Sequence, residues 1–265
     1  MILGILSKIV AESLTSLYPV FVKNIGLPLN IQLWSRCFTY VVISLVFLNY
    51  RTLWKDICSS MGILLSIVTL IHIYVSYKGF LLLESGTAYT IFYLYPLMII
   101  LMSKEPFHPI LLLSMIGVLF MTGGSFQVNA YGIFMVLLAA FTEAIIYYIV
   151  RAFPVSNWHH IFISYIWGCV GLTLYYWNQL TMSTSLMVSV GINGVIGAVG
   201  YWLRFYSMSK LKPLLYALLS YVGILMSFFY GWWFNAEQLT WNKLVGAICI
   251  LIPNLWIKFN TGKVK

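Results

Sequence analysis

The sequence predicts an all-α integral membrane protein in which ten transmembrane helices form two inverted five-helix repeats. Three observations predict this fold: the composition, the spacing of the apolar segments, and residues that recur half a chain apart. Of the 265 residues, 62% are hydrophobic and 8% are charged, whereas soluble domains are about 25% charged. The formal net charge of +9 comes from basic residues dispersed between apolar runs, so we expect no nucleic-acid partner.

Apolar windows bounded by charged residues, proline, asparagine and tryptophan define the ten expected spans. A helix needs about 20 residues to cross a hydrocarbon core of about 30 Å. The N-terminal window counts as a span and not as a signal peptide, because Lys8 and Glu12 interrupt it. The windows run approximately over residues 2–22, 30–50, 58–79, 83–103, 108–125, 130–151, 159–178, 185–208, 213–234 and 240–259.

The basic residues predict the orientation, because cytoplasmic loops retain lysine and arginine. With a cytoplasmic N-terminus, nine basic residues fall in inside loops and three, Lys23, Lys78 and Lys243, fall outside. We therefore expect both termini in the cytoplasm and place the chain in the cell membrane, plasma or inner. The inside set is Arg51, Lys55, Lys104, Arg151, Lys210, Lys212, Lys258, Lys263 and Lys265.

Five spans per half force the second half to enter the membrane from the opposite side, as in many secondary transporters. We expect one repeat over residues 1–127 and the other over 128–265. V-A-E-S around Glu12 matches F-T-E-A around Glu143, and Y-K-G-F (77–80) matches L-R-F-Y (203–206). S-K-E-P-F (103–107) likewise echoes N-A-E-Q-L (235–239).

The first span carries Lys8 and Glu12 along one polar face, four residues apart. They form a pair that neutralises itself, or Glu12 faces a cavity and binds a cationic group or a proton. In the second span we expect Arg36 to satisfy backbone carbonyls or an acid at a helix end. In the third span, His72 shares a face with Thr69 and Ser76, as a hydrogen-bonded core residue or a proton relay.

The sixth span carries Glu143, with Tyr147 and Arg151 following at spacings of four. An unpaired carboxylate at this depth costs about 2.5–3.5 kcal/mol on insertion scales, so it marks a site for substrate, coupling ion or proton. The alternative is a static link to a basic residue on a neighbouring helix.

Polar faces recur on the eighth and ninth spans. Arg204 follows Asn193 at helical spacing, and Gly191, Gly194, Gly197 and Gly200 predict close helix packing. We expect the polar faces to line one pocket, with a substrate-binding set of Glu12, His72, Glu143, Tyr147, Asn193, Arg204, Tyr216 and Ser220.

Three blocks resemble the drug/metabolite transporter superfamily, EamA type. They are Q-L-W-S-R-C-F-T-Y (32–40), L-E-S-G-T-A-Y-T-I-F-Y-L-Y-P-L (83–97) with Glu105 after it, and Y-A-L-L-S-Y-V-G-I-L (216–225) followed by A-E-Q-L-T-W-N-K-L-V-G-A-I-C-I-L-I (236–252). The resemblance covers nearly the whole chain. It implies ten helices, a five-plus-five inverted repeat, a central cavity and alternating access.

The expected function is secondary transport of a small polar or amphipathic metabolite. Two intramembrane acids favour an amine or amino-acid-like solute, with protons as coupling ion. Because Lys8, Arg36, Lys78 and Arg204 outnumber those acids, an anionic or nucleotide-linked cargo stays open, as does a structural or sensory protein of the same fold. The four cysteines lack ligand spacing and no HExxH occurs, so we expect no metal, no cofactor and no enzyme activity.

Overall fold

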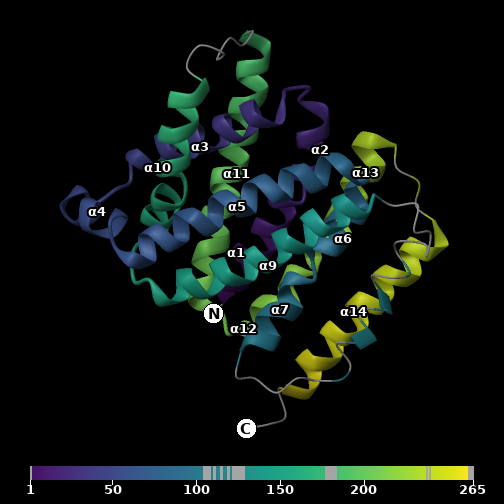
Figure 1. The fold of residues 1–265 in the computed structure, drawn as a ribbon. Helices are drawn as coiled ribbons and strands as arrows, with labels where there is room; N and C mark the ends of the chain where they lie inside the picture. The colour runs from purple at the N-terminus through teal and green to yellow at the C-terminus, as the bar shows by residue number, and fades with distance from the viewer. Residues whose placement is uncertain are drawn as a thin grey trace.

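A computed structural model describes residues 2–103, 109, 112–113, 116–117, 120, 129–176, 184–236, 238 and 240–261. Every regular element in these residues is a helix, and the helices pack side by side in one bundle (Figure 1). Most of the predicted fifth span, 108–125, lies outside the described residues. Glu105 and Glu237 lie outside them as well.

The described residues form thirteen helices: twelve follow the predicted windows, and one, between the second and third windows, is an addition. The described part of the first half contains α1 (Ile2–Thr15), α2 (Tyr18–Asn24), α3 (Leu29–Leu45), α4 (Tyr50–Ile57), α5 (Ser60–Leu82), α6 (Ser85–Phe92) and α7 (Tyr95–Met102). The second half contains α9 (Ala130–Ala152), α10 (Asn157–Tyr176), α11 (Thr184–Lys210), α12 (Pro213–Ser220), α13 (Val222–Asn235) and α14 (Trp241–Thr261).

Helix α4 corrects the second window, which we expected to continue to residue 50. Helix α3 ends at Leu45, and the Asn49 side chain accepts a hydrogen bond from the Arg51 backbone N–H to begin a new helix. Tyr50 and Trp54 are exposed on α4. The connection between the second and third spans is therefore a short amphipathic helix.

Three windows consist of two helices each, and proline explains two of the interruptions. The proline ring clashes with the carbonyl four residues earlier, and α1 ends at Thr15, four residues before Pro19. Helix α6 ends at Phe92, four residues before Pro96. The third interruption, at Tyr221, contains no proline.

At the third interruption, a serine hydroxyl competes with backbone N–H groups for a helix carbonyl. The Ser220 hydroxyl donates to the Tyr216 carbonyl at 2.9 Å, a contact that bends helices, and Gly223 follows one turn later. The matching break in the first half, at Tyr93–Leu94, faces this one: α6 packs on α13 and α7 packs on α12.

The long helices pack in pairs. Helix α5 lies along α9, α1 lies along α11, and α3 lies along α10. The first and last of these pairs are visible in the centre and at the upper left of Figure 1, and α14 lies at the edge of the bundle. Charged side chains on α1, α9 and α11 are therefore brought toward one another.

Within the described residues, five segments are long and apolar enough to cross a membrane. They are Ile2–Asn24, Ser60–Leu82, Ser85–Met102, Ala130–Ala152 and Pro213–Asn235. Large apolar side chains such as Val46, Leu174 and Trp233 are also exposed on the outer surface, as lipid contact requires and water disfavours. The structure fits a multi-pass membrane protein.

The glycine repeat on α11 packs as predicted at three of its four positions. A Cβ at Gly194 would meet Thr39 of α3, and one at Gly197 would meet the Tyr18 and Tyr40 hydroxyls. A Cβ at Gly200 would lie 3.2 Å from Thr15 of α1. Only small residues allow α11 this close to α1 and α3.

Candidate functional site

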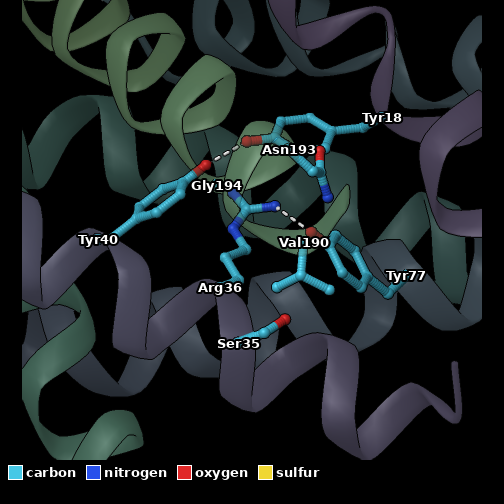
Figure 2. A pocket seen from close by; sticks show the side chains of 8 residues that line it. All are labelled: Tyr18, Ser35, Arg36, Tyr40, Tyr77, Val190, Asn193 and Gly194. Atoms are coloured by element: carbon cyan, nitrogen blue, oxygen red, sulfur yellow. Dashed lines mark hydrogen bonds between the residues drawn. The ribbon is translucent and has the colours of Figure 1, made fainter. Parts of the chain in front are cut away.

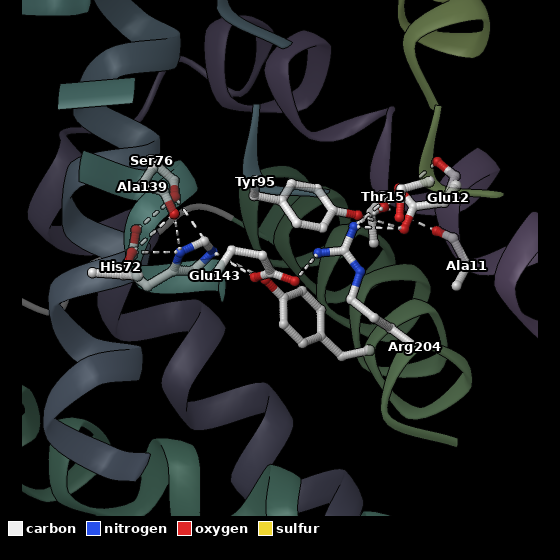
Figure 3. A network of polar contacts seen from close by, with 12 residues as sticks. Ala11, Glu12, Thr15, His72, Ser76, Tyr95, Ala139, Glu143 and Arg204 are labelled. Atoms are coloured by element: carbon white, nitrogen blue, oxygen red, sulfur yellow. Dashed lines mark hydrogen bonds and ion pairs between the residues drawn. The ribbon is translucent and has the colours of Figure 1, made fainter. Parts of the chain in front are cut away.

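Four charged side chains meet in the interior of the bundle. Lys8 and Glu12 come from α1, Glu143 from α9 and Arg204 from α11, and each side chain is at most 1% exposed. Figure 3 shows Arg204 lying between the two carboxylates. Segments nearly 200 residues apart in sequence thus share one ion network.

Arg204 holds both acids through its two terminal nitrogens. Nη1 donates to Glu143 Oε1 at 2.8 Å. Nη2 lies 3.2 Å from each Glu12 oxygen and 3.1 Å from Thr15 Oγ1. Such charge-assisted contacts are stronger than neutral hydrogen bonds, so Arg204 links α1, α9 and α11.

Glu12 has three further partners from its own half of the chain. Lys8 Nζ and the Tyr93 hydroxyl donate to its carboxylate, and the Tyr95 hydroxyl donates to Oε1 at 3.2 Å. Tyr93 and Tyr95 flank the interruption between α6 and α7. Gly223 gives the Tyr93 hydroxyl room, because a Cβ there would overlap it and lie 3.0 Å from Glu12 Oε2.

Glu143 is less completely paired than Glu12. Its Oε2 atom lies 3.4 Å from His72 Nε2, but the alignment is too poor for a hydrogen bond, and this oxygen accepts none from the described residues. His72 Nδ1 instead contacts the Ala139 carbonyl at 3.1 Å and Thr142 Oγ1 at 3.0 Å. A buried acceptor without a hydrogen-bond donor is costly, so Glu143 is held less completely than Glu12.

A second buried cation lies beside this network. Arg36 of α3 is 6% exposed, and its guanidinium is surrounded by five tyrosine rings at 4.6–5.6 Å from their centroids. Its hydrogen bonds go to phenol oxygens, at 3.2 Å to Tyr77 and at 3.0 and 3.3 Å to Tyr165. We call the set of Arg36 with Tyr18, Tyr40, Tyr77, Tyr165 and Tyr201 the Arg36 box.

A pocket opens onto the Arg36 box. Its empty volume is about 180 Å³ with the open mouth included. Figure 2 shows Arg36 reaching toward Tyr77, with the Tyr18 and Tyr40 hydroxyls in contact behind it. The remaining lining residues are Ser35, Val190, Asn193 and Gly194.

Comparison with known proteins supports the fold alone. No protein-family model matches the chain, and no curated protein matches it. One solved structure, described only as a crystal structure of a protein, covers 95% of this chain and 96% of its own, with a TM-score of 0.71 and 17% sequence identity. The chain shares its fold. At that identity the likeness carries no function.

The structure brings together most of the predicted site residues. Glu12, His72, Glu143 and Arg204 contact one another, and Lys8 Nζ lies 3.5 Å from the centroid of the Tyr216 ring. The structural alternatives for both acids are observed: the Lys8–Glu12 pair and the link from Glu143 to a basic residue. That these residues bind substrate stays a prediction.

The other three predicted residues lie at the margins. The Tyr147 ring packs on Tyr216 at 4.8 Å, and its hydroxyl accepts from Arg151 at 3.0 Å. The Ser220 hydroxyl bonds the Tyr216 carbonyl. Asn193 lies apart from the ion network, in the Arg36 pocket. The expected single pocket is thus two neighbouring clusters.

The Arg36 box was not predicted from the sequence. We expected Arg36 to satisfy backbone carbonyls or an acid, but its hydrogen bonds go to tyrosines. The available signal was the placement of Tyr40, Tyr165 and Tyr201 well inside their apolar windows, whereas Tyr18 and Tyr77 lie near window ends. Interfacial tyrosines sit at the membrane boundaries instead.

Proposed function

We propose that the chain is a secondary transporter that moves a small polar or amphipathic metabolite by alternating access between two inverted five-helix halves. The observation that carries the proposal is the buried ion network that joins the halves. Arg204 and Glu143 come from the second half, and Glu12 comes from the first. Intramembrane ionisable groups at the meeting point of two repeats are typical of transport sites.

The helix packing supports the inverted repeat. The first span packs on the eighth (α1 on α11) as the sixth packs on the third (α9 on α5). The second and seventh spans pack on each other (α3 on α10), as do the interrupted fourth and ninth. Exchanging each span with the one five places away leaves this set of contacts unchanged, which is the behaviour of a two-fold internal repeat.

The ion network suggests how the halves move. Arg204 is bound within its own half to Glu143 and across the boundary to Glu12. Separation of the halves breaks the Arg204–Glu12 contacts and exposes Glu12 with Lys8, while Arg204 stays on Glu143. A proton or a solute amine at either carboxylate weakens its hold on Arg204.

The charge balance favours a solute that carries an anionic group. Lys8 and Arg204 neutralise Glu12 and Glu143 in this state, so the two acids leave no surplus negative charge for a purely cationic solute. Arg36 is an additional buried cation. An amino-acid-like solute, with both an amine and a carboxylate, fits this balance, and a purely anionic metabolite is the second candidate. We place the protein in the cell membrane with both termini cytoplasmic.

Counterflow in proteoliposomes tests the proposal. Vesicles containing the full chain are loaded with unlabelled solutes from a panel of amino acids, amines and organic anions, and accumulation of labelled solute is measured. We expect exchange of at least one class, and we expect Glu143→Gln to lose or flatten its pH dependence. Asp56→Asn, which removes an acid outside the spans, is the matched control.

Two results count against it. If folded protein exchanges no member of the panel, the structural or sensory alternative replaces transport. If exchange is independent of pH and Glu143→Gln keeps full activity, proton coupling through Glu143 is wrong, although transport itself survives.

A further inference from the structure

We propose that the Arg36 box binds an oxyanion, the carboxylate or phosphate group of a small solute. Binding at this site is a property of the pocket alone. Its role as the anionic half of a transport site rests on the proposed function above.

The first argument is the missing countercharge. Among the described carboxylates, which are Glu12, Asp56, Glu84 and Glu143, none forms an ion pair with Arg36. Buried charges are normally paired, because removing one ion from water costs several kcal/mol. Arg204, buried to a similar extent, has two carboxylates. Arg36 therefore carries the positive charge that an anion site needs, and no described carboxylate neutralises it.

The second argument is that the tyrosines make the empty site tolerable. A cation over an aromatic face gains about 0.5–1 kcal/mol at exposed sites and about 2 kcal/mol when desolvated. Five rings surround Arg36, so together they offset much of the desolvation cost. The guanidinium is held in place before a ligand arrives, which lowers the entropic cost of binding.

The third argument is an unpaired polar side chain in the same pocket. Asn193 Oδ1 is shielded from solvent and makes no hydrogen bond within the described part of the chain. Figure 2 places Asn193 beside Tyr18, on the wall next to the guanidinium. A carboxamide rotated about its last bond presents its N–H groups instead, so Asn193 can donate to an oxygen that Arg36 attracts.

The position of the pocket suits one charged group of a small solute. Arg36 and Asn193 lie two to three turns from the starts of α3 and α11, about 10–15 Å along the helices at 1.5 Å per residue. In this state the pocket has room for about one water molecule, a volume of about 10 Å³, so a carboxylate or phosphate binds there only with movement of the lining side chains.

Tyr201 connects the pocket to the ion network. Its ring centroid lies 4.8 Å from the Arg36 guanidinium carbon and 5.4 Å from that of Arg204, and its hydroxyl lies 3.4 Å from His72 Nε2. The Tyr201 side chain therefore separates a carboxylate bound at Arg36 from His72 and Arg204, the two residues that contact Glu143. This geometry suits a carboxylate and an amine on one molecule.

Thermal unfolding of the purified full chain in detergent tests the binding. The melting temperature is measured against increasing sodium acetate and sodium phosphate, with sodium chloride at equal ionic strength as reference. We expect a saturable rise of about 2–4 °C at several times the dissociation constant. We expect Arg36→Gln to abolish the rise, Tyr77→Phe to weaken it, and Arg51→Gln, which removes an exposed arginine on α4, to keep it.

Three outcomes would overturn the inference. The parent protein melts at the same temperature in all three salts, Arg36→Gln retains the full rise, or only vesicles of dioleoylphosphatidylglycerol stabilise the chain. The last result would identify the occupant as a lipid headgroup and not a solute. If Arg36→Gln does not fold, Tyr77→Phe together with the parent titration decides.

The two proposals fail separately. Saturable stabilisation that needs Arg36, without counterflow, leaves the anion site standing and removes transport. Counterflow that is indifferent to Arg36→Gln and Tyr77→Phe leaves transport standing and removes the role of the Arg36 box in it, while the melting-temperature titration alone decides whether the box binds an anion.

Discussion

The two buried arginines of this chain have opposite surroundings. Arg204 contacts Glu12 and Glu143, one carboxylate from each half of the sequence. Arg36 lies among tyrosines and forms no ion pair within the described residues. The difference shows that burial alone does not define the role of an arginine. Carboxylates of the chain neutralise Arg204. Tyrosine rings stabilise Arg36, which has no carboxylate partner among the described residues.

The energetic consequences differ accordingly. Removing one member of a buried ion pair leaves an uncompensated charge and costs about 3–5 kcal/mol. Removing a cation that has only aromatic neighbours leaves neutral tyrosines, so the loss is limited to cation–π and hydrogen-bond contacts. Variants at the two arginines therefore separate a contact that holds the bundle together from one that recognises a ligand.

The largest expected effect is that of Arg204→Gln. It removes the cation that Glu12 and Glu143 share, and we expect the free energy of unfolding to fall by about 3–5 kcal/mol, with counterflow lost. Unfolding is followed in mixed micelles by tryptophan fluorescence. Lys210→Gln, which removes an exposed positive charge from the end of the same helix, is expected to change stability little.

Arg36→Gln sharpens the comparison in the same assay. We expect a smaller loss of stability than for Arg204→Gln, because no carboxylate is stranded. If Arg36→Gln is as destabilising as Arg204→Gln, the two sites have the same role and the contrast between them is wrong.

The next effect in size contrasts two tyrosines. Tyr93→Phe removes a hydroxyl that donates to the Glu12 carboxylate, and we expect a cost of about 1.5–3 kcal/mol. Tyr77→Phe removes a phenol oxygen 3.2 Å from Arg36 Nη1 and is expected to cost about 1.5 kcal/mol, the lower end of the same range, because Arg36 keeps its hydrogen bonds to Tyr165. Both are measured as shifts of the unfolding midpoint. Equal shifts would mean that Glu12 does not depend on Tyr93.

Hydrophobic windows predicted the helices more accurately than the contacts between them. The described helices from α5 onward begin and end within a few residues of the expected spans, because length and hydropathy are properties of the local sequence. The positions of Pro19 and Pro96 explain the breaks after Thr15 and Phe92, although we did not predict these breaks. The break at Tyr221 and the short helix α4 depend on a serine contact and an asparagine cap, which hydropathy does not report.

The site was predictable in composition but not in pairing. The polar positions on the first, third, sixth, eighth and ninth windows indicated a buried network, and Glu12, His72, Glu143 and Arg204 do meet. Asn193 and Arg204 lie on the same face of α11 but about 16 Å apart along it, at 1.5 Å per residue. Arg204 therefore reaches both acids while Asn193 lies in the other cluster, and only the packed structure shows which helices are opposite each position.

Gly197→Ala tests the close approach itself. A methyl group there would meet the hydroxyls of Tyr18 and Tyr40, so we expect a loss of about 1–3 kcal/mol from overpacking. The anion-dependent rise in melting temperature should fall with it, since both rings belong to the Arg36 box. Unchanged stability together with an unchanged anion response would show that α11 does not hold the tyrosines.

Gly191→Ala is the matched substitution with the smallest expected effect, two turns earlier on the same helix. Nothing lies within 4 Å of a Cβ at this position, and alanine is favoured over glycine in a helix by about 0.8–1.0 kcal/mol in peptide hosts. We expect a neutral to slightly higher unfolding midpoint and an unaltered response to acetate and phosphate. A loss as large as that of Gly197→Ala would mean that helix flexibility, and not contact with the Arg36 box, explains both variants.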